Sequence, residues 1–417
     1  MLAVLLLPML MQGQTSISSP YSRFALGRLT PNNNILNMAM GGTSIASRNP
    51  LFVNPENPAS YTAFDSTSFV FDGAFLLKRQ TLSNIGVSSK TNDASLGYIT
   101  MGFPVAKWWK SSFGVMPFSS VGYLIGRDTV MSNLGKVEFG YTGNGGLVKA
   151  YLGNAFQPFK NLSVGFNLSY IFGSVSHEST VIFPDSANMY STRYNNSSVL
   201  KNLNLDFGLQ YHITLKNGTF MVAGLTYSPK QSLHGLADEL GVSFLHNYSS
   251  NLDQNKDTVL YVSGSKGDVV LPANVGGGLS FGRVNRWTAS ADVKWQKWSD
   301  YTYFGNSEAL RNDLRISVGG QYKPSPLDIG KFYKRVTYRA GLRYELSYLE
   351  LRNTRLNEFG VSMGVGLPMK KSRSTINIAM EAGTYGTTNN GLISESYLRF
   401  SVGVSLYDKW FLKRKFD

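Results

Sequence analysis

Cysteine is absent from all 417 residues of the chain. Disulfides, thiolate metal sites and a lipid-bearing cysteine are therefore excluded. Charged residues are also few, at 16% of the chain. Beyond the first residues, no apolar run reaches the roughly 18 residues that a membrane-spanning helix needs. We therefore expect neither a disulfide-stabilised fold nor a helical membrane protein.

Histidine is scarce, and little in the sequence points to catalysis. The four histidines lack the spacing of metal ligands: His177, His212, His234 and His246. Residues 360–364 match the nucleophile-elbow spacing G-x-S-x-G, which needs a strand-turn-helix context. Ser362 instead lies in an alternating, strand-like stretch, where a small residue on a barrel wall is the simpler interpretation. We expect no enzyme activity, no metal and no cofactor.

Alternation of apolar and polar residues is abundant, and the stretch 287–298 has it in its clearest form. Its odd positions from Trp287 to Trp295 are apolar, and its even positions from Thr288 to Gln296 are polar. A period of two places alternate side chains on opposite faces of a strand. Both a soluble sandwich and a transmembrane barrel have such strands. The number and length of the copies distinguish the two.

The alternating pattern recurs to the end of the chain in segments long enough to cross a bilayer. A tilted transmembrane strand needs about 9–11 residues, whereas soluble strands usually have about five or six. The segments are 66–77, 93–105, 112–123, 142–155, 162–173, 199–214, 219–229, 269–282, 287–298, 313–323, 336–347, 357–367, 374–384 and 395–407. They predict an all-β fold, a transmembrane antiparallel β-barrel of about 14 strands over residues 66–417.

The connections between these segments alternate between long and mostly short. Short turns face the periplasm and long loops face outward in such barrels. The sequence therefore predicts a barrel in a Gram-negative outer membrane, surrounded by lipid and lipopolysaccharide, with both termini periplasmic. The long connections are 78–92, 124–141, 174–198, 230–268, 299–312, 348–356 and 385–394.

The N-terminal part of the chain lacks sustained alternation. Residues 2–11 form a short apolar run, which predicts a signal peptide over 1–14, with a buried helix as the alternative. Residues 15–65 are rich in Gly and Pro but too apolar for a solvated tail. We expect this segment to pack inside the lumen as a hatch.

Positive charge is concentrated at the predicted periplasmic end. The net charge is +14, and the periplasmic turns with the C-terminal tail hold 17 Lys or Arg against three acids. This basic rim has three interpretations: it binds anionic lipid headgroups, it binds an acidic periplasmic or outer-membrane protein, or it only aids solubility. The predicted compartment argues against a nucleic-acid partner.

Charged residues of both signs also occupy predicted lumen positions. We expect most of them to form a mutually paired network. The alternative is that Arg339, Arg343 or Arg399 receives the carboxylate of an amphiphilic ligand. The predicted lumen set is Asp206, Asp292, Lys294, Arg339, Arg343, Glu345, Glu381 and Arg399.

Several short motifs, in the right order, resemble the FadL/TodX-type outer-membrane transporters of hydrophobic compounds. Met40-Gly41-Gly42-Thr43 with Asn57-Pro58-Ala59 is similar to the N-terminal hatch of that family. The matching wall segments are 271–274, 286–300, 338–345 and 360–367. The extra Asn54-Pro55-Glu56 beside the hatch triplet departs from the family pattern.

The resemblance implies a fourteen-stranded barrel plugged by a hatch that contains Gly41, Gly42, Asn57, Pro58 and Ala59. It implies passive uptake of hydrophobic small molecules such as long-chain fatty acids, with hatch movement and lateral release into the bilayer through a kink in the wall. Among barrels of this type, some resemble accessory subunits of outer-membrane complexes for secretion or barrel assembly. That role is the alternative function.

The glycine run is where the sequence predicts the kink in the wall. Gly276, Gly277 and Gly278 follow Pro272 within a predicted strand, and no helix follows that would bind a phosphate. Glycine inside a strand often marks a bend or a close approach of another backbone.

Overall fold

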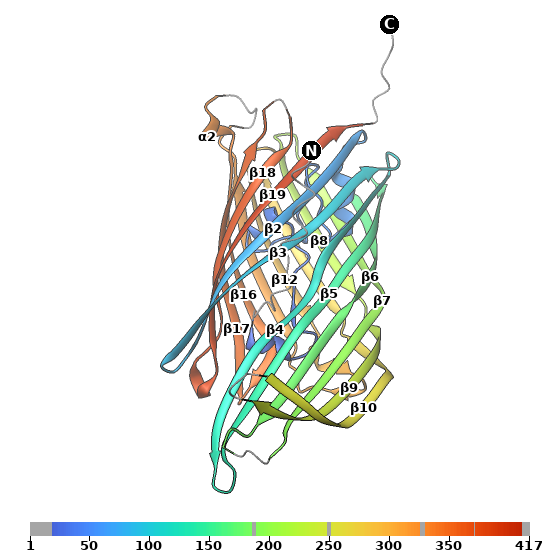
Figure 1. Cartoon of the computed structure of the whole chain (residues 1–417). Helices are drawn as coiled ribbons and strands as arrows, with labels where there is room; N and C mark the ends of the chain where they lie inside the picture. The colour runs from blue at the N-terminus through green and yellow to red at the C-terminus, as the bar shows by residue number, and fades with distance from the viewer. Residues whose placement is uncertain (1–18, 186–188, 248–251, 326–329, 371, 411–417) are drawn as a thin grey trace, which may run out of the picture.

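The computed structural model describes residues 19–185, 189–247, 252–325, 330–370 and 372–410. The predicted signal peptide lies outside these residues. Fourteen antiparallel strands close into one barrel, because the last of them, β19, pairs with the first, β2 (Figure 1). The barrel strands are β2 (Ser68–Asn84), β3 (Val87–Pro104), β4 (Trp109–Met131), β5 (Gly135–Phe159), β6 (Leu162–Ile182), β7 (Ser191–Thr214), β8 (Thr219–Ser228), β11 (Asn274–Arg283), β12 (Trp287–Gln296), β15 (Asp313–Tyr322), β16 (Thr337–Leu351), β17 (Thr354–Pro368), β18 (Thr375–Gly386) and β19 (Ser394–Lys409). The predicted fold class and strand number are confirmed.

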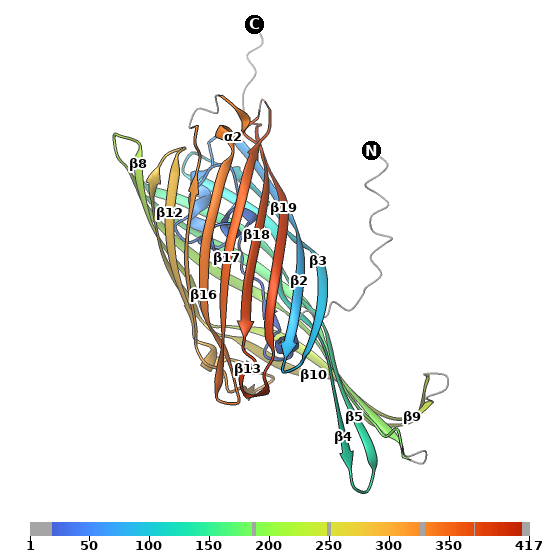
Figure 2. The ribbon, with the colours of Figure 1, turned by 90° about the vertical axis from the view of Figure 1, so that its left-hand side faces the viewer.

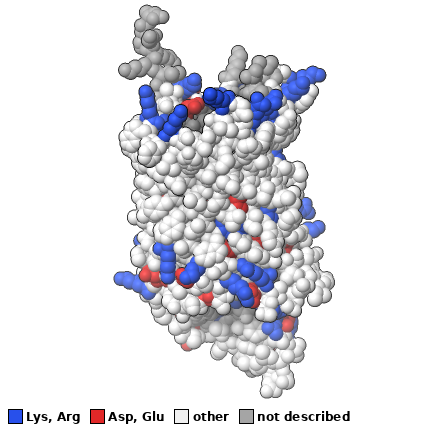
Figure 3. Space-filling view, turned by 180° about the vertical axis from the view of Figure 1, so that it is seen from behind, with Lys and Arg blue, Asp and Glu red and all other residues white. Residues whose placement is uncertain are grey.

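The apolar side chains of the alternating pattern face outward. On β7, Leu203, Leu205 and Phe207 are exposed, whereas Asn204 is buried in the interior. A soluble sandwich would bury the apolar side instead. Figure 3 shows the result on one face of the barrel, as a largely uncharged band between charged zones at its two ends. This band is what lipid requires of a transmembrane barrel.

The strands extend beyond the predicted boundaries at the end of the barrel opposite α2. Most of the predicted loops 78–92, 124–141 and 174–198 are strand. The prediction of a loop over 230–268 is also wrong, because these residues form a hairpin of β9 (Gln231–Asn247) and β10 (Leu252–Leu271). Outside the bilayer neither face of a strand must be apolar, so the period of two that identified the other strands is missing there.

The β9–β10 hairpin continues the barrel wall outward. β9 pairs with the N-terminal part of β7, and the hairpin flares away from the barrel beyond its rim (Figure 2). Two short strands cover the inside of this end: β13 (Thr302–Tyr303), which pairs with β10, and β14 (Asn306–Ser307). The other short elements of the wall are η4 (Trp298–Asp300), α2 (Phe332–Arg335) and η5 (Asn389–Gly391).

The N-terminal segment, residues 19–65, packs inside the barrel. It contains η2 (Pro20–Arg23), β1 (Arg28–Leu29), α1 (Ile35–Met38) and η3 (Pro58–Ala63). Side chains of Asn34 and Asn57 cap α1 and η3, and Pro58 begins η3 without an N–H that needs a partner. These caps explain why the segment forms short helical turns rather than a strand. Its role as a movable hatch stays a prediction.

None of the helices in the described part of the chain has the length and apolar character to span a membrane. Lys and Arg side chains crowd the end of the barrel that carries α2 (Figures 1 and 3). The basic rim predicted for the turns therefore lies at one end of the molecule. Its partner stays a prediction.

Candidate binding cavity behind an interrupted wall

Of the two predicted hatch glycines, Gly41 lies directly against the wall backbone, whereas a Cβ on Gly42 would lie 2.9 Å from the Asn33 side chain. Gly41 has a φ of 72°, and its N–H donates a hydrogen bond of 2.8 Å to Oγ of Ser362. A Cβ on Gly341 would lie 2.2 Å from the Gly41 nitrogen. Ser362, from the G-x-S-x-G match, therefore anchors the N-terminal segment.

The Asn57-Pro58-Ala59 triplet lies against β6 and β7. The Asn57 amide donates to the Ile45 carbonyl oxygen at 2.7 Å and accepts from the Ala59 N–H at 3.1 Å. A Cβ on Gly208 would lie 2.1 Å from Oδ1 of Asn57, and one on Gly165 would lie 2.7 Å from the Pro58 carbonyl carbon. Two wall glycines therefore provide the space that this turn occupies.

The predicted kink residues Gly276, Gly277 and Gly278 lie in a regular part of the wall. β11 pairs with β8 and β12 over its whole length without a register shift. Added Cβ atoms on Gly276 and Gly278 would lie within 3 Å of the Ile45 side chain. These positions accommodate the N-terminal segment, and the wall is interrupted elsewhere.

The interruption lies between β7 and the junction of β8 with β9. β7 pairs with β8 as far as Phe207 and with β9 from Lys201, so residues 202–206 face 228–233 without a regular register. Pro229 stands at the β8–β9 junction and Pro272 at the β10–β11 junction. Proline has no N–H to contribute to a ladder. We call 202–206 with 228–233 the seam.

Side chains close the seam where the backbone ladder fails. The Gln231 side-chain amide donates to the Leu205 carbonyl oxygen at 2.9 Å and accepts from the Leu205 N–H at 3.1 Å. It thereby replaces the peptide group of a neighbouring strand. Ser228 Oγ also donates to Oδ1 of Asp206 at 2.7 Å. Side chains reorient more easily than the backbone of paired strands, so the seam is easier to open than the rest of the wall.

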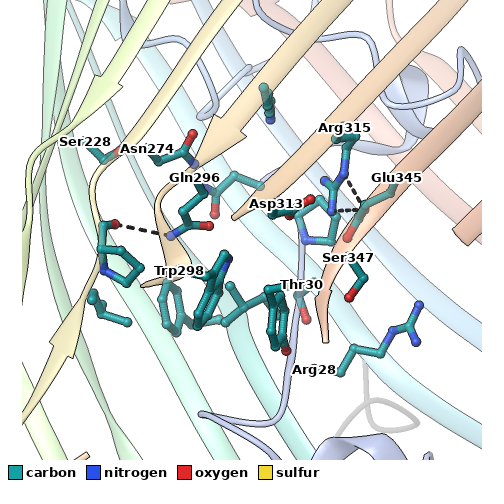
Figure 4. A pocket seen from close by; sticks show the side chains of 18 of the residues that line it. Arg28, Thr30, Ser228, Asn274, Gln296, Trp298, Asp313, Arg315, Glu345 and Ser347 are labelled. Carbon is teal, nitrogen blue, oxygen red and sulfur yellow. Dashed lines mark hydrogen bonds and ion pairs between the residues drawn. The ribbon is translucent and has the colours of Figure 1, made fainter. Parts of the chain in front are cut away.

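A cavity of about 180 Å³ lies directly behind the seam (Figure 4). Its outer side is formed by residues on both edges of the seam, and its inner side by the N-terminal segment around β1. The opposite wall comes from β12 and β15 to β17. Residues that represent these sides are Asn204, Asp206, Ser228, Pro229, Pro272, Arg28, Thr30, Gln296, Asp313, Glu345 and Glu358.

One part of the cavity wall is aromatic and apolar. Trp298 and Tyr348 stack with ring centroids 4.1 Å apart, and both are buried. Phe118 and Leu271 also line the cavity. The alternating pattern predicts 287–298 as one strand, but β12 ends at Gln296, and η4 turns Trp298 inward.

The other part of the cavity wall is charged, and the charges are paired. Arg315 lies 2.6 Å from Glu345, Lys149 lies 2.7 Å from Asp206, and Lys294 lies 2.6 Å from Glu56. Glu56 belongs to the N-terminal segment, so the last pair joins that segment to the wall. The extra acid beside the hatch triplet therefore has a structural partner.

A central ion network contains two of the three predicted lumen arginines, Arg343 and Arg399. Nη2 of Arg343 lies 2.6 Å from both Glu358 and Glu381. Arg399 lies 3.2 Å from Glu381, and Arg28 pairs with Glu358. Arg343 and Arg399 line the cavity. Arg339 does not line it, and its side chain donates a hydrogen bond of 3.3 Å to Oε1 of Gln321.

Sequence reasoning missed Arg28, Arg315, Glu358 and Trp298. Arg315 and Glu358 occupy lumen positions of the alternating pattern, so the period of two could have identified them. Arg28 and Trp298 lie outside the regular strands, where no periodic signal exists. Among the described residues, no cluster of His, Asp and Glu is arranged to hold a metal ion.

The sequence model of the family described as BamG matches this chain over residues 1–417. The chain belongs to the BamG family. No curated protein matches it.

Solved structures show which barrels this BamG-family protein is similar to. The toluene transporter TodX of Pseudomonas putida has 18% sequence identity and a TM-score of 0.59, over 93% of this chain and 100% of TodX. A FadL homologue of Pseudomonas aeruginosa has 12% identity and a TM-score of 0.58, over 92% and 100%. The toluene transporter TbuX of Ralstonia pickettii has 14% identity and a TM-score of 0.58, over 90% and 98%.

At these identities the likeness establishes a shared fold. The resemblance to FadL/TodX-type barrels is therefore confirmed for the architecture, while the family that matches the whole sequence is BamG. By their descriptions, two of these neighbours are toluene transporters and the third is a FadL homologue.

Proposed function

We propose that this protein is a barrel of the Gram-negative outer membrane that takes up small hydrophobic or amphiphilic compounds. A compound is held in the cavity and leaves through the seam into the bilayer. One observation carries the proposal: Asn204 and Asp206 on one edge of the seam, and Ser228 and Pro229 on the other, all line the cavity. Only side chains therefore separate its contents from the outer surface.

The outer surface beside the seam is apolar. Leu203, Leu205 and Tyr227 flank it and are exposed by 56%, 38% and 47%. These side chains belong to the band that faces lipid. An apolar compound gains about 25 cal/mol per Å² when its surface leaves water for such an environment. Release into lipid is therefore favourable, whereas passage through a wet lumen would be costly.

The proposal includes movement of the N-terminal segment as a hatch. Residues 28–32 of that segment line the cavity, and Glu56 ties the segment to Lys294 at 2.6 Å. Beside its apolar packing against the wall, the segment makes polar contacts with it, for example from the Ser44 and Ile45 N–H groups to Asp292 at 2.6 and 2.8 Å. Water can replace such contacts one at a time, which favours stepwise displacement.

A reversible cross-link across the seam tests this route. The chain has no native cysteine, and the Asp206 and Ser228 side chains already meet at 2.7 Å. In cells that carry Asp206→Cys with Ser228→Cys, we expect oxidation to stop uptake of toluene and reduction to restore it. Unchanged uptake in the oxidised protein would contradict lateral release.

The matched control places the same cross-link in the regular wall. Ser280 on β11 and Ser290 on β12 are register partners whose hydroxyl groups are hydrogen-bonded. The pair Ser280→Cys with Ser290→Cys should leave uptake the same in oxidised and reduced cells. A loss of uptake in this control would assign the effect to general stiffening of the barrel.

A second candidate function is that of an accessory subunit in an outer-membrane complex. Within the described residues, the backbone of 252–267 on β10 pairs with β9 on one side and has no strand on the other. Val259 and Tyr261 are exposed there. An open edge of this kind is a typical site for adding a strand of another protein.

Purification from native outer membranes distinguishes the two functions. An accessory subunit should co-purify in stoichiometric amounts with a partner, and Val259→Lys with Tyr261→Lys should release that partner. The variant Asn255→Lys on the same exposed strand serves as the control. A partner-free barrel that still takes up toluene would exclude the accessory function.

A further inference from the structure

The basic rim carries cations that no acidic side chain neutralises. Six of its exposed basic residues lie in or directly beside the turns at that end: Lys107, Lys160, Lys216, Arg283, Arg286 and Lys334. In the part of the chain that the structure describes, none of these six forms an ion pair with an acidic side chain. The cations that line the cavity, by contrast, all have acidic partners. Negative charge for the rim therefore has to come from another molecule.

The opposite end of the barrel has charges of both signs that pair with each other. Lys136 lies 3.1 Å from Asp128, and Arg193 lies 3.7 Å from Glu178. Figure 3 shows this difference, since the upper end is mostly blue and the lower end is both blue and red. The excess of positive charge is therefore a property of the basic rim and not of both ends.

The same turns expose large apolar side chains beside the basic ones. The exposed fraction is 49% to 70% for Trp108, Phe159, Leu215, Val284, Phe332 and Trp410. Trp410 stacks on Phe69 of β2 with ring centroids 4.4 Å apart, and Trp108 stacks on Phe156 of β5 at 5.9 Å. Aromatic side chains are enriched at membrane–water interfaces, where their rings lie at the level of the headgroups. Cations and aromatic rings side by side therefore suit the headgroup region of a lipid leaflet.

These residues surround the barrel instead of covering one side. They lie in the connections from β3 to β4, β5 to β6, β7 to β8, β11 to β12 and β15 to β16, and directly after β19. Because the barrel closes through β19 and β2, these places are spread around its circumference. A globular partner would contact one part of such a ring, whereas a lipid leaflet contacts all of it.

We propose that the basic rim binds phospholipids whose headgroups carry a net negative charge, of the phosphatidylglycerol type, in the periplasmic leaflet of the outer membrane. The Lys and Arg side chains pair with the phosphate oxygens, and the apolar side chains beside them lie at the interface. This interaction does not depend on what the cavity binds, so it goes beyond the proposed function.

Spin-labelled lipids measure the preference directly. The purified barrel is placed in phosphatidylcholine vesicles, and electron paramagnetic resonance gives the fraction of spin-labelled phosphatidylglycerol or phosphatidylcholine that is held at the protein surface. We expect a preference for phosphatidylglycerol of up to about fivefold, the contribution of one basic residue near an anionic lipid surface. Lys107→Gln with Lys216→Gln and Arg286→Gln should bring the two lipids close to equal binding.

The matched control removes three exposed basic residues from the opposite end. Lys90, Arg127 and Lys256 lie on β3, β4 and β10, and their change to Gln alters the net charge equally but should keep the wild-type preference. If the wild type shows no preference, or if both triple variants lose it equally, the proposal is wrong. If the rim variant keeps the preference but releases a stoichiometric protein partner from native outer membranes, the rim binds an acidic protein instead.

A depth measurement covers the case in which the rim variant does not fold. The native chain has no cysteine, so Phe159→Cys can carry a single nitroxide label. In vesicles that contain phosphatidylglycerol, we expect oxygen to relax this label more strongly than a water-soluble nickel chelate does. Val259→Cys is the control, because Val259 is exposed by 68% and Phe159 by 70%, and its label on β10 should show the reverse order. Equal access of the nickel chelate to both labels would place the rim in water and overturn the proposal.

Discussion

At the scale of the residue, small and charged side chains inside the barrel matter most. Glycines on the inner wall, such as Gly208 and Gly341, allow the N-terminal segment to approach the strand backbone directly. Buried ions such as Arg343 and Glu358 join strands that are far apart in sequence. The lumen positions of Arg343 and Arg399 were predictable from alternation. Their ion-pair partners could not be predicted, because pairing depends on the strand register and on Arg28, which lies in the N-terminal segment.

The variant Gly208→Ala tests the contact between the wall and the N-terminal segment. Its Cβ would lie 2.1 Å from Oδ1 of Asn57 and 2.8 Å from Cδ of Pro58. We expect a loss of about 1–3 kcal/mol in unfolding free energy, as for other overpacked sites, measured by urea unfolding in detergent. Gly126→Ala, where an added Cβ meets nothing within 4 Å, should unfold like the wild type. Equal behaviour of the two variants would contradict the tight contact.

The variant Arg343→Met tests the central ion network. It leaves Glu358 and Glu381 without one of their buried cations. Breaking a buried pair from one side costs about 3–5 kcal/mol, so we expect a loss near 3 kcal/mol, since Arg28 and Arg399 remain. Adding Glu381→Gln should recover part of the loss in the same unfolding measurement. No change in stability on removing Arg343 would argue against the network.

At the scale of the element, the bilayer explains which strands the sequence could predict. Segments that cross lipid must alternate, so all fourteen barrel strands were found near their observed positions. The β9–β10 hairpin extends outward past the barrel rim, its sequence does not alternate cleanly, and it was predicted as a loop. The seam was also missed, because it depends on Pro229 and Pro272 at two junctions that only the folded wall brings together.

The variant Gln231→Leu tests whether one side chain closes the seam. It removes both hydrogen bonds to the Leu205 backbone, at 2.9 and 3.1 Å. We expect the Leu205 amide to exchange its hydrogen about fivefold to tenfold faster, as expected for one lost hydrogen bond. The Leu209 amide, in the regular ladder with β8, should keep its rate. Unchanged exchange at Leu205 would mean that the seam is closed by other contacts.

At the scale of the whole molecule, charge and strand length agree on one orientation. The basic rim and the short turns lie at the end with α2, and the long hairpins lie at the other end (Figures 2 and 3). This asymmetry could be predicted from the sequence, because the charges of each segment can be counted without knowing any tertiary contact. The cavity could not be predicted in this way, since it arises from elements spread from β1 to β19.

Single cysteines at the two ends test the orientation. The native chain has none, so Lys256→Cys on β10 and Lys334→Cys in α2 would each be the sole thiol. We expect a maleimide attached to a large polymer to label Lys256→Cys on intact cells. Lys334→Cys should react only after the outer membrane is broken. The reverse order would place the basic rim outside the cell.

The most direct test of the central claim is a crystal structure of the barrel with 4-bromotoluene, located by the anomalous signal of bromine. We expect a bromine peak inside the cavity between Trp298 and the seam. Bromine peaks confined to the outer, lipid-facing surface, with the cavity holding no bromine, would contradict it.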